Sequence, residues 1–438
     1  MEPADWDAGS QQRVALMLDD PHHTSTVSAR SRAARAATAA VSLLSACAFA
    51  VAVASSYSAS AEARALPVLA FVNFPEKGLA VSIAALPHLD AEGIPTLSDM
   101  LLANGSRVVW GICGAGRIAH DFTAALKAMG AEVGAVAAGS LLGNTTGRAA
   151  EFARVYSIPV SYGSYDELAK DARVTAVYIA TINNLHFANA KLMLASGKHV
   201  LLEKPATVGV PEFESLVALA ADYKLLFVTN YWSRFFPAFI WAKSVATSGL
   251  LGAIVHIQGD LAFQAMTSSP AGDRFFKRAL GGGAVLDMGC YLVQFAANFL
   301  PQPHPTEDVD SAASFAVSAV GRVEDGVDLD VAFTIAIERG SASFGTSLTR
   351  ASDFALQIYC EHGKVSLASP ANCPVEASYT FYADAMEDPN QPTPCCGQPE
   401  LETRRFAQPL PAYPTSLLAH RAYPNGMGFV YVASAFER

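Results

Sequence analysis

The chain has 438 residues, a formal net charge of −10 and 51% hydrophobic residues. This length allows two or three domains, and the hydrophobic content favours large cores over disorder. The acidic balance argues against a protein that binds nucleic acid or anionic membranes through a basic surface, so a small-molecule enzyme fits better. The seven cysteines form no CxxC pair and have no matching His spacing, so no metal site is expected.

The N-terminal part of the chain is expected to lie outside the enzyme. Residues 1–29 are polar and mixed in charge, as in disordered segments. Three arginines precede the uncharged run 36–54, which has the length of a bilayer span but is rich in Ala and Ser. Three interpretations stay open: a membrane anchor, which we favour, a cleaved targeting peptide, or an error in the gene model. Without an anchor or a targeting peptide the protein would be cytoplasmic. We interpret 1–106 as an N-terminal extension.

A strand, a glycine turn and a helix follow each other from residue 108. An apolar strand is expected over 108–112 and an Ala-rich helix over 122–129. A dinucleotide pyrophosphate needs this order, because glycines allow a tight turn and close backbone approach, and the helix N-terminus attracts the anion. The alternative is an ordinary glycine turn. The candidate cofactor contacts are Gly114, Gly116, Arg117, Ile118 and Ala119.

Strands and helices then alternate. Strands are expected over 132–138, 174–180 and 199–202, and helices over 149–156, 187–196 and after Ser164, a candidate N-cap. Units of this length predict a doubly wound parallel sheet of the Rossmann type, in an α/β protein, with ligand sites at the carboxyl ends of its strands. We place this domain at 107–206. Its strand ends carry the polar residues Thr181, Asn183, His186, Glu203 and Lys204.

The pattern changes after residue 206. Helices are expected over 211–222 and 237–248, followed by strands over 254–263, 311–320, 329–337, 341–348 and 354–359. Runs of strands with few helices between them predict an antiparallel or mixed sheet in a second domain. We place this substrate and dimerisation domain at 207–438.

Four motifs occur in an order and spacing that resembles the Gfo/Idh/MocA oxidoreductases. They are the Gly114 turn, ASGKHVLLEKP at 195–205, YWSRFFP at 231–237 and GGGAVLDMGCY at 281–291. Over roughly 107–437 the chain looks most like the dimeric dihydrodiol dehydrogenases of that family, also described as NADP-dependent D-xylose dehydrogenases. The resemblance implies a Rossmann domain followed by an α/β domain with an open, mostly antiparallel sheet. The outer face of that sheet often builds the dimer, so a homodimer is expected.

The resemblance also implies catalytic roles for three residues. The position of Lys204 contacts the nicotinamide ribose and assists proton transfer, Tyr291 is the acid/base, and Asp287 lies beside it. Tyrosine, with a reference pKa of about 10, needs a nearby cation to act as a base, and Lys204 can supply it. Asp287 and Tyr291 are four residues apart, which predicts one face of a helix beginning after Gly283. The alternatives are an exposed lysine, a core tyrosine and a helix-start carboxylate.

Three further residues have competing interpretations. Trp232 and Arg234 lie where the family places its substrate pocket, and an indole face packs well against a sugar ring or a cyclic diol. Trp232 fits an interdomain core almost as well, and Arg234 could pair a structural carboxylate. His186 looks like the family's nucleotide-side histidine, or else a helix-start histidine with its hydrogen bonds satisfied.

The sequence departs from the family pattern in two places. After the second strand, an arginine is typical of NADP binding and an acidic residue of NAD binding. Residues 138–148 have neither at the expected place, and Ser140, Arg117 or Arg148 could bind the 2′-phosphate, so NADP is expected with NAD still open. Family members also continue beyond the stretch 424–429 with a long helix and a further segment. Because this chain stops at Arg438, we expect a truncated C-terminus.

The sequence therefore predicts an NAD(P)-dependent oxidoreductase that oxidises a cyclic trans-diol or an aldose such as D-xylose, with no metal and no nucleic acid partner. Two alternatives remain. One is a non-catalytic nucleotide-binding sensor or scaffold. The other is a glycosidase that uses NAD in a closed redox cycle.

Overall fold

The computed structural model describes residues 107–139, 146–265, 273–300, 316–337, 339–382 and 400–437. The apolar run 36–54, the rest of the extension 1–106 and Ser140 lie outside the described residues. The described chain forms two compact units. One comprises 107–237 together with 409–437, and we call it the parallel-sheet unit. The other comprises Ala238–Gln408, and we call it the mixed-sheet unit.

The parallel-sheet unit is built on six strands in the order β3-β2-β1-β4-β5-β6, all of them parallel. The strands are β1 Val109–Cys113, β2 Glu132–Ala137, β3 Val160–Tyr162, β4 Ala176–Ile179, β5 His199–Glu203 and β6 Phe227–Asn230. The sequence order reverses between β1 and β4, which is the topological switch point of a doubly wound sheet. The predicted Rossmann fold is confirmed.

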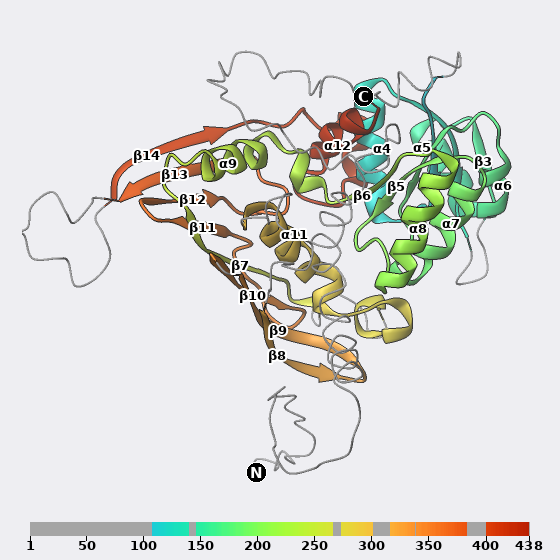
Figure 1. Ribbon diagram of the computed structural model, residues 1–438. Helices are drawn as coiled ribbons and strands as arrows, with labels where there is room; N and C mark the ends of the chain where they lie inside the picture. The colour runs from blue at the N-terminus through green and yellow to red at the C-terminus, as the bar shows by residue number, and fades with distance from the viewer. Residues whose placement is uncertain are drawn as a thin grey trace, which may run out of the picture. The chain divides into compact units, whose positions relative to one another are not determined.

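Helices cover both faces of this sheet (Figure 1). They are α4 Arg117–Met129, α5 Thr146–Tyr156, α6 Tyr165–Lys170, α7 His186–Ala195, α8 Val210–Tyr223 and α12 Phe429–Glu437, with short 3₁₀ turns η1 Asn183–Leu185, η2 Trp232–Phe235, η7 Thr415–His420 and η8 Gly426–Gly428. The predicted cap at Ser164 is confirmed: its side chain accepts from the Glu167 N–H, and the Glu167 carboxylate accepts from the Ser164 N–H.

The parallel sheet continues beyond residue 206, where we had placed the domain boundary. The short strand β6 pairs with β5, with Val200 opposite Phe227. The segment after residue 408 also returns to this unit, where the buried Asp121 carboxylate accepts hydrogen bonds from the Tyr413 hydroxyl and from the backbone N–H groups of 422 and 423. These contacts join residues about 300 positions apart in sequence, so no local pattern indicates them.

The mixed-sheet unit contains eight strands in the order β14-β13-β12-β11-β7-β10-β9-β8. They are β7 Ile254–Ala262, β8 Ala316–Glu324, β9 Val327–Ile337, β10 Gly340–Ser347, β11 Leu356–Cys360, β12 Gly363–Leu367, β13 Glu376–Tyr382 and β14 Glu400–Ala407. Only the pair β7 and β10 is parallel among these neighbours, so the predicted open, mostly antiparallel sheet is confirmed.

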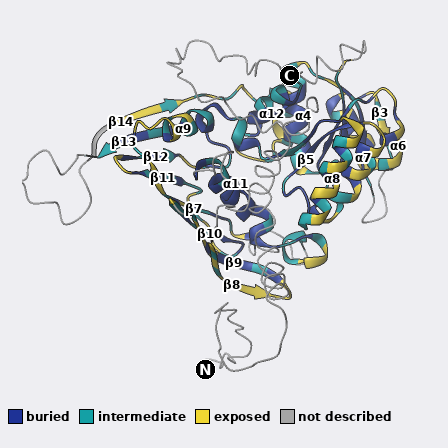
Figure 2. Cartoon of the chain, in the orientation of Figure 1, coloured by how far each residue is buried: buried dark blue, intermediate teal, exposed yellow. Residues whose placement is uncertain are grey.

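Two helices, α9 Pro237–Thr247 and α11 Cys290–Phe299, lie on the same face of this sheet (Figure 1). Their aromatic rings form the core: Phe239 packs against Phe299, and Trp241 stacks on Tyr379 of β13. Figure 2 shows α11 almost entirely buried and β8 largely exposed, because β8 is an edge strand of the sheet.

One helical stretch of the described chain, Arg278–Phe299, is long and apolar enough to cross a membrane by length and composition. However, 78% of its most apolar window is buried inside the protein. Core helices pass the same test, so this stretch is weak evidence for a membrane span.

Candidate active site

The glycine turn lies at the switch point of the parallel sheet. Gly114 has a φ of 105° and its N–H donates to the Ala137 carbonyl at the end of β2 (2.9 Å). A Cβ at Gly114 would lie 2.9 Å from the Ala180 carbonyl oxygen after β4. Only glycine combines this conformation with this close approach. We call this turn, 114–116, the Gly114 cradle; it lies at the switch point, where doubly wound sheets bind nucleotides.

Helix α4 begins directly after this turn, with Gly116 as its N-cap residue. In the described chain no side chain caps this helix, and its first turn contains no acidic residue. The predicted helix start at 122 is corrected to Arg117, so Arg117, Ile118 and Ala119 form the first helical turn. The uncapped helix start, its positive dipole end and a basic first residue together favour a phosphate at this end.

Two arginines lie next to the turn. The exposed Arg117 guanidinium lies over the Tyr423 ring, 5.4 Å from its centroid. Arg148, in the first turn of α5, reaches back and donates from Nη2 to the Ala115 carbonyl (3.4 Å). Both cations can therefore meet a phosphate near the turn.

The residues after β4 hold the loop together. Thr181 Oγ1 accepts from the Asn189 side chain (3.2 Å), and Asn183 is buried at the start of η1. His186 is completely buried, with Nδ1 2.6 Å from the Pro205 carbonyl oxygen and Nε2 3.1 Å from the Thr181 carbonyl oxygen. Both ring nitrogens thus face backbone groups of the protein. The structure favours the helix-start interpretation of His186, in which it links two loops rather than contacting a nucleotide.

Strand β5 ends at Glu203, whose side chain is buried. Its Oε1 accepts from the Tyr178 hydroxyl and from Asn230 Nδ2, both at 2.6 Å, and its Oε2 accepts from the Lys204 backbone N–H (3.2 Å). Burial raises the pKa of the Glu203 carboxyl, while these donors and the Lys204 charge oppose the rise. Glu203 therefore ties three neighbouring strands together and fixes the backbone of Lys204.

The predicted substrate residues lie in η2. Trp232 is buried and stacks on Phe429 at 4.2 Å between ring centroids, with Phe236 against its edge. One indole face, which we had assigned to a sugar ring, is thus occupied by the protein itself, because α12 packs back onto this turn. The burial and the stacking favour the core interpretation of Trp232, and its substrate role stays a prediction. Desolvation lowers the pKa of the neighbouring Arg234 guanidinium.

Asp287 and Tyr291 lie in the mixed-sheet unit, and both are buried. A helix starts after the glycine turn, as predicted, but its first part is the π-helical turn η5 Val285–Gly289, which continues into α11. The Cys290 N–H donates to the Val285 carbonyl, five residues back, which is the π-helical pattern. Asp287 Oδ1 pairs with Arg274 Nη2 at 3.1 Å.

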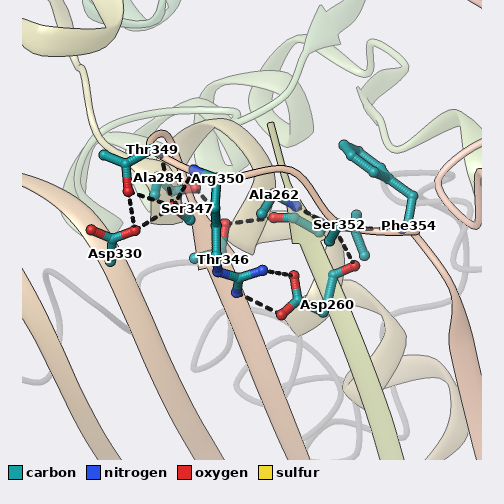
Figure 3. A network of polar contacts seen from close by, with 11 residues as sticks. Asp260, Ala262, Ala284, Asp330, Thr346, Ser347, Thr349, Arg350, Ser352 and Phe354 are labelled. Carbon is teal, nitrogen blue, oxygen red and sulfur yellow. Dashed lines mark hydrogen bonds and ion pairs between the residues drawn. The ribbon is translucent and has the colours of Figure 1, made fainter. Parts of the chain in front are cut away.

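Two neighbouring strands contact the start of this helix. The Val285 N–H donates to Asp328 Oδ2 of β9 (2.8 Å), and the Ala284 carbonyl accepts from Thr346 Oγ1 of β10 (3.2 Å). Figure 3 shows Thr346 and Ala284 in this network of polar contacts. Arg274, Asp328 and Thr346 were not predicted, because they lie between 13 and 62 residues from their partners in sequence.

Lys204 and Tyr291 belong to different units, so their predicted cooperation stays a prediction. No group of three or more His, Cys, Asp or Glu side chains within the described ranges could hold a metal ion.

Comparison with known proteins identifies the family. Residues 108–231 match the Gfo/Idh/MocA oxidoreductase family model, described as an NAD-binding Rossmann fold, and residues 239–366 match the Gfo/Idh/MocA C-terminal domain. The chain belongs to the Gfo/Idh/MocA oxidoreductases. The trans-1,2-dihydrobenzene-1,2-diol dehydrogenase of Sus scrofa is 36% identical over 272 residues, which are 61% of this chain and 76% of that relative.

Solved structures of this family share the fold. A 3-ketoreductase from Actinomadura kijaniata, in complex with NADP and TDP-benzene, superposes with a TM-score of 0.58 at 21% identity, over 75% of this chain and 89% of that one. A levoglucosan dehydrogenase in complex with NADH superposes with a TM-score of 0.58 at 20% identity, over 76% of this chain and 89% of that one. The chain is thus an NAD(P)-dependent oxidoreductase, and the Gly114 cradle and the uncapped α4 fit a dinucleotide.

Proposed function

We propose that the protein oxidises one hydroxyl of a small cyclic trans-diol or of an aldose such as D-xylose, with NADP as its preferred cofactor. The observation that carries this proposal is the strand end Glu203-Lys204, fixed by a buried hydrogen-bond network in the sheet that also forms the Gly114 cradle. The diol dehydrogenase that is 36% identical to this chain supports the substrate class.

The order of the strands supports the placement of the cofactor. Gly114 follows β1, and Lys204 follows β5, which is the second strand from β1 on the β4 side. At a strand spacing of about 4.8 Å, the two strand ends are roughly 10 Å apart along the sheet. A dinucleotide whose pyrophosphate binds at α4 has one nucleoside on each side of the switch point. Lys204 would then contact the nicotinamide side.

The proposed reaction breaks a C–H and an O–H bond and forms a C=O bond. The nicotinamide, when bound, accepts the hydride from the substrate carbon. Tyr291 would accept the hydroxyl proton, which then leaves to solvent. Lys204 would hold the ribose and favour the phenolate form of the tyrosine. Asp287, paired with Arg274, would hold the first turn of the helix that carries Tyr291.

The preference for NADP is supported by charge. Strand β2 is followed by 138–148, which contains no acidic residue that would repel a 2′-phosphate. Arg117 and Arg148 lie next to the glycine turn. Charge-assisted hydrogen bonds from arginine to phosphate are the usual basis of this preference.

The test is a spectrophotometric screen at about 340 nm, the absorbance of the reduced nicotinamide. NAD and NADP are each tried with benzene dihydrodiol, D-xylose and glucose. We expect turnover with a diol or an aldose, and Tyr291→Phe should reduce kcat by about 10²-fold while leaving cofactor affinity nearly unchanged. Lys204→Ala tests the role of Lys204. Its control is Lys191→Ala, because Lys191 is exposed. Cofactor binding without turnover would support a sensor, and bound NAD with glycoside cleavage but no net reduction would support the redox-cycling glycosidase.

We also propose two features of the assembly. The exposed face of the eight-stranded sheet is the surface for a homodimer, since Ala332, Thr334 and Ala336 of β9 expose small side chains there. The molar mass in solution, measured by light scattering, tests this.

The run 36–54 is proposed as a membrane anchor. Membrane fractionation of the full chain, compared with a variant lacking 1–106, tests this proposal.

A further inference from the structure

The helix that carries Asp287 and Tyr291 starts at a turn with very little free space. Gly282 lies against the backbone of 274–275, where a Cβ would lie 2.5 Å from the Phe275 carbonyl oxygen. The Gly283 N–H donates to the same carbonyl (3.0 Å), and Gly283 has a φ of 129°. These contacts therefore fix the backbone of Gly282 and Gly283 directly before the helix.

The carboxylate of Asp328 lies at the N-terminal start of this helix. Its Oδ2 accepts from the Val285 N–H at 2.8 Å, and the Ala284 N–H is a further donor to the same carboxylate. Its Oδ1 lies where a Cβ of Gly283 would be, so the glycine is required to admit the carboxylate. A side chain from β9 thus caps a helix whose first turn begins 43 residues earlier in sequence.

The position of this carboxylate is itself fixed by packing. The residues on either side of it in β9, Val327 and Leu329, belong to a buried apolar cluster that also contains Ala284. Thr346 of β10 holds the Ala284 carbonyl from the sheet side. The helix start is therefore fixed at its N–H groups by β9 and at its first carbonyl by β10.

This arrangement matters for Tyr291 because the first turn is π-helical. A π-helical turn is less stable than an α-helical one and persists where the surroundings hold it in place. If the first turn changed to α-helical geometry, Tyr291 would rotate about the helix axis relative to Asp287. A displacement of about 1 Å at a reacting group can reduce the rate by about 10²-fold.

We propose that Asp328 is a positioning residue: by capping the helix at Ala284 and Val285 it keeps the first turn π-helical and so sets the orientation of Tyr291. This inference rests on the proposed role of Tyr291. Asp328 itself is not assigned any contact with substrate or cofactor.

The test compares Asp328→Ala and Asp328→Asn with Asp330→Ala. Asp330 is the matched control, since it lies on the same strand but its carboxylate binds Ser347 and Thr349 instead of the helix (Figure 3). We expect Asp328→Ala to reduce kcat by about tenfold or more with the Kd for NADP unchanged. Asp328→Asn, which keeps one acceptor oxygen, should recover part of that loss, and Asp330→Ala should keep the wild-type kcat.

Hydrogen exchange gives a readout that does not need activity. Peptides covering 284–291 should exchange faster in Asp328→Ala than in the wild type, and not in Asp330→Ala. The inference would be overturned if Asp328→Ala kept the wild-type kcat and the wild-type hydrogen exchange of 284–291. It would also be overturned if Asp328→Ala and Asp330→Ala lost kcat and NADP binding equally. If Tyr291→Phe turned over like the wild type, the proposed function would fail, while the exchange data would still decide whether Asp328 fixes the helix start.

Discussion

Gly114 and Ala180 bring the ends of β1 and β4 together through backbone atoms alone, since a Cβ at Gly114 would lie 2.9 Å from the Ala180 carbonyl oxygen. The next strand end is held in another way: the Glu203 carboxylate accepts from Tyr178 of β4 and Asn230 of β6. The carboxyl edge of the parallel sheet is thus held by close backbone packing at the switch point and by hydrogen bonds at the strand that presents Lys204. A rigid edge is what a site needs to hold a cofactor in one orientation.

Gly114→Ala should destabilise the protein and weaken cofactor binding. A non-glycine residue in the left-handed region costs about 1–2 kcal/mol, and the overlap with Ala180 adds to that cost. Gly130→Ala is the control, because Gly130 also has a positive φ (76°) but a Cβ there would contact nothing within 4 Å. We expect a larger fall in melting temperature for Gly114→Ala and a Kd for NADP raised by about tenfold or more in this variant only. Equal effects of both substitutions on the Kd would contradict the role of the cradle.

Asp121 should control the attachment of the C-terminal segment. Its buried carboxylate accepts from the Tyr413 hydroxyl (3.1 Å) and from the backbone N–H of Tyr423 (2.8 Å). Asp121→Ala leaves these donors without an acceptor, which costs about 2–4 kcal/mol. We expect a lower melting temperature and faster tryptic cleavage after the exposed Arg421. Asp222→Ala, at an exposed position, should change neither, and an unchanged cleavage rate in Asp121→Ala would show that other contacts hold the segment.

The sequence predicted the parts of the fold that depend on local patterns. Each of these patterns, the alternation of strand and helix and the glycine turn, is contained in a stretch of about 15 residues. Together they predicted the correct parallel sheet. The short strand β6 was not predicted, because it is defined by its pairing with β5. The return of the chain after residue 408 was not predicted, because it depends on contacts between distant residues such as Asp121 and Tyr423.

The same distinction applies to the candidate site. The EKP and GGGA motifs are contiguous, so the resemblance that they carry predicts catalytic roles for Lys204, Asp287 and Tyr291, and those roles stay predictions. Asp328 acts on a helix whose first turn begins 43 residues earlier, and neither its charge nor its neighbours in sequence indicate this. The sequence left two interpretations of Trp232 open because a buried aromatic residue and a pocket wall have the same local sequence, and its stacking on Phe429 favours the buried one.

His199 should make the protein sensitive to mild acid. Its buried Nδ1 accepts from the Leu226 N–H (2.9 Å), and burial lowers the pKa of His199 to about 4. Because the unfolded chain binds a proton near the ordinary pKa of about 6.5, the stability that the neutral ring provides is complete above that pH and is lost as the pH falls towards 4. The shift corresponds to at most about 3 kcal/mol.

Urea unfolding of the wild type and of His199→Asn at several pH values between 7 and 4 measures this effect. Asparagine keeps an acceptor for the Leu226 N–H but does not titrate, so its free energy of unfolding should fall less over this range. His362→Asn, at an exposed position, should retain the wild-type pH dependence. If His199→Asn lost stability as steeply as the wild type, another group would be responsible.

Arg148 should decide between the two cofactors. Its guanidinium reaches the glycine turn at Ala115, and the segment before it contains no acidic residue. Removal of a charge-assisted contact to the 2′-phosphate costs about 1.5–3 kcal/mol, so Arg148→Ala should raise the Kd for NADP by about tenfold to a hundredfold and leave the Kd for NAD nearly unchanged. Arg154→Ala, an exposed position on the same helix, is the control for general charge effects. Equal losses for NADP and NAD in Arg148→Ala would mean that Arg148 stabilises the turn itself, and the preference for NADP would then rest on Arg117, which Arg117→Ala tests in the same titration.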